Sequence, residues 1–170
     1  MSNPLYGQNK ADKSIVQLLF QKSDANTHTN TTDADDLFSY NIAADTLEPG
    51  NIIRIKAFAT VTDNNSTDTL TPVLKFGGTA IATGAALNVD DSDIVYAWAD
   101  VHVKSIGSAG TMTAISEIRT DALGVTTVIA ATSLTSKDTT AALAVALNVD
   151  WSVAHAENIV RLDAASIELL

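Results

Sequence analysis

The sequence predicts an all-β fold, an antiparallel jelly-roll-like β-sandwich of about eight strands, and the alternation of side-chain types is the clearest sign of it. From Ile53 to Val61 every second residue is aliphatic, and the residues between them are larger or polar. The segment from Val95 to Lys104 repeats the pattern. A period of two over nine or more residues is typical of a strand with one buried and one exposed face.

The spacing of turn residues also indicates a sandwich. Clusters of Gly, Pro, Asn, Asp and Ser separate the apolar segments at regular intervals, with no helical pattern between strands. Such spacing is typical of an all-β sandwich or barrel, and eight strands in two sheets match a jelly roll. Pro72 cannot donate to a ladder, so its strand is expected at an edge or with a bulge. The expected strands cover 37–42, 52–62, 69–76, 79–83, 92–105, 111–119, 125–133, 143–151 and 158–169.

Composition excludes several classes of function. The 170 residues carry a formal net charge of −10, and a chain that repels phosphate is not expected to bind nucleic acid. The absence of cysteine excludes disulfides, thiol catalysis and cysteine-ligated zinc. No run of about 18 apolar residues occurs, so no membrane partner is expected.

The first residues differ from the rest of the chain, and we expect an N-terminal arm over 1–24 and a jelly-roll β-sandwich domain over 25–170. Asn9 can cap a short helix over 10–22. The apolar side chains of this arm leave two interpretations open, because they can fold onto their own core or dock on a neighbouring subunit or the capsid. The candidate contact residues are Ile15, Val16, Leu18, Leu19 and Phe20.

No catalytic or metal-binding constellation can be assembled from this sequence. His28, His102 and His155 are far apart, without ligand spacing. Acidic clusters at 33–36 and 90–93 offer oxygen ligands for calcium, but they lack the glycine and terminal glutamate of an EF-hand, which favours solvated turns. No nucleophile elbow, phosphate loop or His-Glu-x-x-His motif is present. We therefore expect a non-enzymatic protein without a cofactor or a metal.

Aromatic side chains fall on the parity opposite to the small aliphatic residues. Phe58, Tyr96 and Trp98 point outward if the aliphatic parity faces the core. An outward aromatic face suits either sugar stacking or a subunit interface. The inverse assignment would place these rings against the second sheet. Tyr96 and Trp98 are the candidate oligomer-interface residues.

Several segments of the chain resemble small virion proteins of tailed phages. The likeness covers residues 40–170, and one departure is Ala59, where a glycine or a large residue is common. It implies a jelly-roll domain on the virion exterior, of the capsid cement or decoration, head-fibre or tail-fibre type. The segments that carry it are Asp45–Thr60 (DTLEPGNIIRIKAFAT), Leu70–Thr79 (LTPVLKFGGT), Ile94–Lys104, Thr111–Thr132 and Val160–Leu169.

The resemblance and the absence of catalytic motifs together predict a capsid decoration protein. It would bind the major capsid protein and stabilise the outer surface of the capsid. Low aromatic content leaves a thin core without disulfides, which favours a homo-oligomer, and the resemblance implies a homotrimer. The alternative from another class is a carbohydrate-binding, lectin-like module of a phage fibre, because jelly rolls host lectins as readily as capsid parts.

Overall fold

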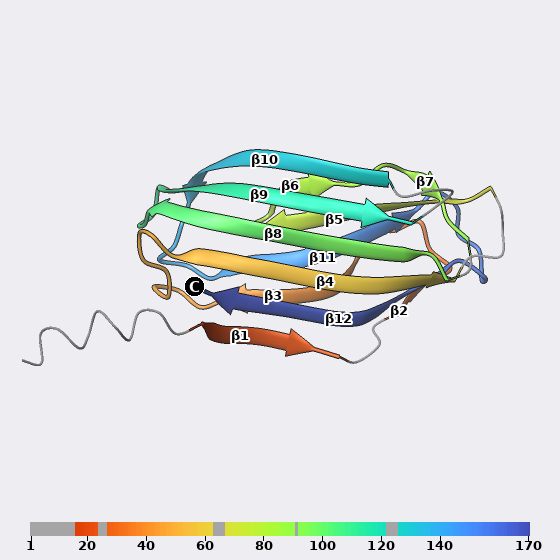
Figure 1. Cartoon of the computed structure of the whole chain (residues 1–170), viewed down its shortest axis with the longest axis horizontal. Coiled ribbons are helices and arrows are strands. Elements are labelled where there is room, and N and C mark those ends of the chain that lie inside the picture. The colour runs from red at the N-terminus through yellow and green to blue at the C-terminus, as the bar shows by residue number, and fades with distance from the viewer. Residues whose placement is uncertain (1–15, 24–26, 63–66, 91, 122–125) are drawn as a thin grey trace, which may run out of the picture.

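The protein is a sandwich of two antiparallel sheets packed face to face (Figure 1). The computed structural model describes residues 16–23, 27–62, 67–90, 92–121 and 126–170. These residues form twelve strands and no helix, so the predicted all-β sandwich is confirmed. Nowhere in the described ranges is there a helix of the length and hydropathy needed to cross a membrane.

The larger sheet has the strand order β1-β12-β4-β8-β9-β10, and β2 pairs with a further stretch of β12 on the edge that β1 also occupies. The smaller sheet has the order β3-β11-β5-β6, and β7 pairs with β5. The strands of the larger sheet are β1 (Gln17–Lys22), β2 (Thr27–Thr29), β4 (Ile52–Thr62), β8 (Ile94–Ser105), β9 (Gly110–Thr120), β10 (Thr126–Lys137) and β12 (Ile159–Leu169). Those of the smaller sheet are β3 (Asp35–Ile42), β5 (Thr69–Phe76), β6 (Thr79–Thr83), β7 (Leu87–Asn88) and β11 (Leu143–Trp151).

The connections follow the jelly-roll order once β1 and β2 are counted as one edge strand. The strands then divide into a set β1/β2-β12-β4-β8 and a set β3-β11-β5-β6, the two four-stranded orders of a jelly roll. The hairpin of β9 and β10 continues the first set beyond β8. In Figure 1 the larger sheet lies in front of the smaller one, and its outer face runs without interruption from β12 to β10.

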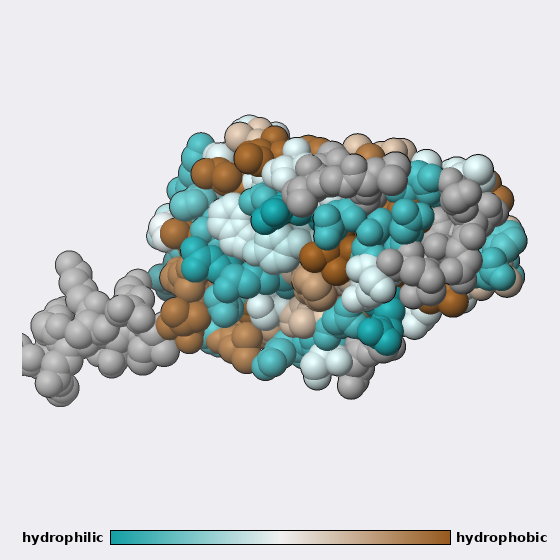
Figure 2. Space-filling view, turned by 45° about the vertical axis from the view of Figure 1, so that its right-hand side comes forward, coloured by the Kyte–Doolittle hydropathy of each residue, from teal (hydrophilic) through white to brown (hydrophobic). Residues whose placement is uncertain are grey.

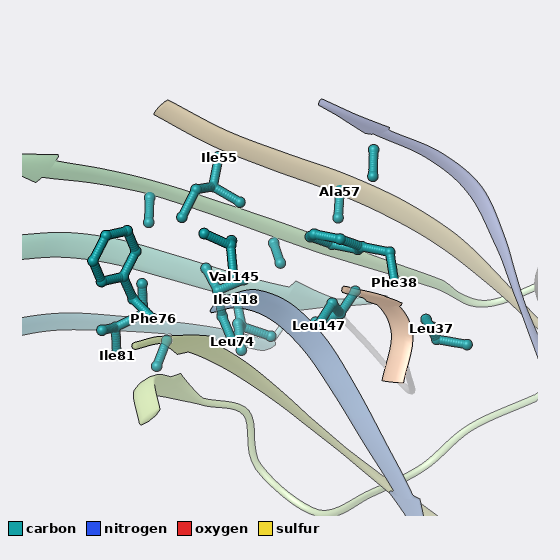
Figure 3. Close-up of a cluster of buried hydrophobic side chains, with 14 of the residues drawn as sticks. Leu37, Phe38, Ile55, Ala57, Leu74, Phe76, Ile81, Ile118, Val145 and Leu147 are labelled. Atoms are coloured by element: carbon teal, nitrogen blue, oxygen red, sulfur yellow. The ribbon is translucent and has the colours of Figure 1, made fainter. Parts of the chain in front are cut away.

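The hydrophobic core lies between the two sheets. The alternate aliphatic side chains of β4 and β8 form one side of it. Ile55 and Ala57 of β4 are buried, as are the matching residues of β8. Figure 3 shows Phe38, Val145 and Leu147 of the smaller sheet lying opposite Ile55 and Ala57. The alternation in the sequence therefore identified the buried face correctly, and alanine at this face allows the two sheets to pack closely.

Two glycines form the hairpin between β5 and β6. Phe76 pairs directly with Thr79, so Gly77 and Gly78 are the whole turn. Their φ angles are 53° and 75°, in the left-handed region. A two-residue hairpin of this kind matches the twist of its strands and requires positive φ at both positions, which favours glycine.

Pro72 lies inside the smaller sheet rather than on its edge. β5 is flanked by β11 on one side and by β6 and β7 on the other. The carbonyl of Pro72 accepts a hydrogen bond from Gly84 N at 2.8 Å, on the side where the partner strand is interrupted between β6 and β7. Since N and O of one strand residue point the same way, the missing N–H falls at this gap and no ladder bond is lost.

The expected short helix over 10–22 is wrong over 17–22. There the chain forms β1, which pairs with β12, whereas residues 10–15 lie outside the described residues. The ring of Phe20 stacks on Phe38 at a centroid distance of 5.7 Å and lies 5.2 Å from Tyr40. These tertiary contacts and the ladder to β12 outweigh the local preference for a helix.

Candidate functional site

The register between β4, β8 and β9 gathers aromatic and charged side chains on the outer face of the larger sheet. Phe58 pairs with Tyr96 and Lys56 with Trp98 across β4 and β8. On the other side of β8, Tyr96 pairs with Arg119 and Trp98 with Glu117. Directly paired residues on one face of a sheet lie about 5 Å apart. We call this cluster the outer platform; it consists of Lys56, Phe58, Tyr96, Trp98, Glu117 and Arg119.

The aromatic side chains of the outer platform face away from the core. Phe58 is 37% exposed, and Tyr96 and Trp98 are half-buried, while their neighbours Ala57 and Ala97 are buried. The outward assignment made from the sequence is therefore confirmed, and the inverse one is wrong.

A bidentate ion pair borders the outer platform, at the next residue pair on the same face of the ladder. Arg54 donates from Nε to Asp100 Oδ1 and from NH2 to Asp100 Oδ2, both at 2.9 Å. The hydrogen bond and the charge of Asp100 raise the pKa of Arg54 above its ordinary value. Two parallel bonds fix both side chains, so this part of the face is rigid and locally neutral.

Two shallow hollows flank the pair of Phe58 and Tyr96. One has a volume of about 300 Å³ and extends over Lys56 toward Ser166 and Lys22. The other has a volume of about 370 Å³ and extends toward Arg119 and Asp121. Both hollows are bordered by the two rings and by charged side chains, so each can accept an inserted side chain or a sugar ring.

The face of the sandwich that is turned toward the viewer in Figure 2 is mixed in character. Figure 2 shows brown and pale groups interspersed with teal ones, without one broad apolar area. Among the exposed apolar side chains are Ile115 and Ile129, on β9 and β10. A face that combines isolated apolar groups with charges is typical of a contact surface that is also stable in water.

Asp93 lies at the start of β8, in the turn next to the second hollow. Burial raises the pKa of the Asp93 carboxyl above its ordinary value, and the nearby carboxylates of Asp90 and Asp121 raise it further, although a hydrogen bond from Asp90 N to Asp93 Oδ2 at 2.7 Å opposes them. The Asp93 carboxyl therefore binds a proton more tightly in the folded chain than in the unfolded chain.

Because the pKa of Asp93 is higher in the folded state, its ionisation destabilises the fold as pH rises. The destabilisation is absent below about pH 4, where both states are protonated, and complete above the raised pKa. Asp93→Asn keeps an acceptor for Asp90 N without the charge. We expect this variant to match the wild type in acid and to exceed its free energy of unfolding at neutral pH. Urea titrations across this range measure the difference, and a constant difference at every pH would contradict the assignment.

The predicted arm residues are divided between the surface and the core. Val16 and Leu18 are exposed, whereas Leu19 and Phe20 pack against the protein's own core. Ile15 lies outside the described residues. Leu19 and Phe20 are therefore not free to dock elsewhere in this conformation, and Val16 and Leu18 remain the accessible members of the set. A truncation of the arm has to spare β1, since its removal would leave part of β12 unpaired.

The three histidines are separate, as their spacing predicted. His28 is buried in β2 with its Nδ1 3.9 Å from Asp35 Oδ2, His102 lies on the outward parity of β8, and His155 lies in the loop before β12. In the described part of the chain, no three His, Asp or Glu side chains gather at metal-binding distance. The carboxylate of Asp35 instead accepts a backbone hydrogen bond from Asp36 N, and that of Asp93 accepts one from Asp90 N in its own turn.

Comparison with known proteins adds a distant fold likeness. No family profile matches the sequence, and no curated protein matches it. A solved structure described as "EclA C-terminal domain; sugar-binding protein" is similar over 86% of this chain and 78% of that chain. The identity is 13% and the TM-score 0.41, a likeness too distant to assign a function. The chain's own strand order supports its classification as an all-β sandwich with jelly-roll topology.

Proposed function

We propose that this protein is a non-enzymatic structural protein of the virion exterior, a capsid decoration protein that contacts its partner through the outer platform. The observation that carries the proposal is the ladder that places Phe58, Tyr96 and Trp98 side by side, facing outward, between charged residues of β4 and β9. The choice of the capsid as the partner rests on the sequence resemblance to phage virion proteins.

The chemistry of the outer platform fits a macromolecular partner. Aromatic residues and arginine are enriched at protein interfaces, and tryptophan, tyrosine and arginine dominate their binding energy. Trp98 lies between Lys56 and Glu117, so charges of both signs border the central ring. The shallow hollows beside Phe58 and Tyr96 suit single inserted side chains of a facing protein surface. Repetition of this contact over many capsid sites would add avidity.

A carbohydrate is the second candidate partner, favoured by the two hollows beside Phe58 and Tyr96. Sugar rings stack their C–H faces on exposed aromatic rings, and charged groups at the rim hydrogen bond to hydroxyls. Arg119 and Asp121 border one hollow, and Lys56 borders the other. A lectin-like module of a phage fibre would use the same surface. The two proposed functions therefore differ in the partner that is bound and not in the position of the site.

The double variant Phe58→Ser/Trp98→Ala tests the site. Both side chains reach the outer surface, so the fold should persist, as circular dichroism can show. We expect binding to capsids stripped of the protein to weaken by at least about tenfold, because buried aromatic anchors are typically worth 2 kcal/mol or more. The matched control is Val153→Ala, an exposed apolar residue in the loop after β11, which should bind like the wild type.

Wild-type occupancy of the capsid by the double variant would contradict the proposed contact. A glycan array with and without calcium distinguishes the partners. Reproducible sugar binding by the wild type that the double variant loses, without capsid binding by either protein, would replace the decoration role with the carbohydrate-binding one.

A further inference from the structure

Strand β10 forms an unusually open edge of the larger sheet. It is 12 residues long and pairs with β9 on one side, and no described strand forms a ladder with its other side. Its inner face rests on β6 of the smaller sheet, where Thr132 Oγ1 donates to Ile81 O at 3.2 Å. In the described part of the chain, the backbone N–H and C=O groups on its outer side therefore have no strand partner.

Charged residues or short length protect the other edges, whereas β10 is long and carries a charge only at its last residue. β3 begins with Asp35 and Asp36, and β1 ends with Lys22. β6 is limited to five residues. By contrast, no charged residue and no proline occurs between Asp121 and Lys137. Charges, proline and short length are the usual means by which an edge avoids pairing, and most of β10 lacks all of them.

A strongly exposed isoleucine accompanies the open edge. Ile129 is 74% exposed, the highest value among the exposed large apolar side chains of the described chain. On the same face Ala131 pairs with Ile115 of β9, which is exposed as well, while Ile129 itself pairs with Glu117 of the outer platform. The ladder between β9 and β10 is continuous from Thr126 to Leu134 and is interrupted by a bulge before Lys137. The open edge and these exposed apolar side chains thus lie on the same regular part of the ladder between β9 and β10.

We propose that β10 pairs antiparallel with β10 of a second copy of this chain, which joins two larger sheets into one continuous sheet. A twofold axis makes identical strands antiparallel, and their backbone groups are then self-complementary. The charge distribution permits this contact, since two copies with a net charge of −10 repel each other over most of their surface but meet here along a strand without charge before Lys137, with Glu117 of each copy one strand away. Ile129 of each copy becomes covered at the junction.

This contact predicts a closed dimer, in place of the homotrimer expected from the sequence. Sedimentation velocity of the full chain at micromolar concentration should give a mass of twice 17.8 kDa. The variant Ile129→Lys/Ala131→Lys places four lysines around the axis on side chains that are exposed in one copy. We expect its dissociation constant to rise at least about tenfold, equivalent to 1.4 kcal/mol.

Ile115→Lys is the matched control, because it adds a lysine to the same face one strand away from the edge. It should remain a dimer, and all variants should keep their β-sheet circular dichroism. Amide exchange of β10 should be slow in the wild type and fast in the double-lysine variant. A monomeric or trimeric wild type, a double-lysine variant that stays dimeric, or dissociation of Ile115→Lys to the same extent would overturn the proposal.

Discussion

Trp151→Ala should lower the free energy of unfolding by about 3–5 kcal/mol, the range for truncating a large aromatic side chain in a core. Trp151 is 1% exposed at the end of β11, where it pairs with Leu70 of β5. It is the largest of the fully buried side chains. Because protein interiors are closely packed, the surrounding structure relaxes only partially around the resulting cavity. Urea denaturation measures the change.

Trp151→Phe is the control that separates packing from hydrogen bonding. The indole Nε1 has no hydrogen-bond partner among the described residues, although it is buried. Phenylalanine removes this unsatisfied donor and keeps most of the apolar volume, so we expect a loss of about 1 kcal/mol or less. Equal losses for the alanine and phenylalanine variants would show that packing between the sheets at this position is not what Trp151 contributes.

Asn158→Ala should lower the free energy of unfolding by about 3 kcal/mol, because it leaves a buried carboxylate without a partner. Asn158 is fully buried just before β12, and its Nδ2 donates to Asp68 Oδ2 at 2.8 Å and to Val153 O at 3.0 Å. These bonds connect the loop after β11 to the residue just before β5.

A double-mutant cycle with Asp68→Ala isolates the interaction of the two side chains. The double variant should be less destabilised than the sum of the single variants, because it removes the acceptor together with the donor. Calorimetry and denaturant titration of the four proteins give the coupling. Additive losses, or a loss below about 1 kcal/mol for Asn158→Ala alone, would mean that the Asp68 carboxylate is satisfied from elsewhere.

Most strands could be predicted because each carries a local signal. β5, β6 and β11 have the bounds that alternation and turn residues indicated, and β4 and β8 were predicted with the correct buried parity. β2 and β7 are only three and two residues long, too short for any periodicity. β1 contains adjacent apolar residues that fit a helix equally well, and its strand conformation depends on a partner near the other end of the chain.

The candidate site could be predicted only in part, because its contacts join strands that are far apart in the sequence. Alternation alone placed Tyr96 and Trp98 on an outer face. The pairing of Arg54 with Asp100 spans 46 residues, and the neighbours of Trp98 depend on the register of three strands. Nor does alternation reveal which strand ends a sheet, so the open edge of β10 became visible only with the strand order.

Hydroxyl-radical footprinting of intact particles tests the central proposal, that the outer platform contacts a partner on the virion. In the free protein Tyr96 and Trp98 reach the surface and should be oxidised. In the assembled particle we expect both rings to be protected, while His155, in the loop before β12, reacts equally in the two forms. Equal oxidation of Trp98 in the free and assembled protein, or absence of the protein from the particles, would contradict the proposed function.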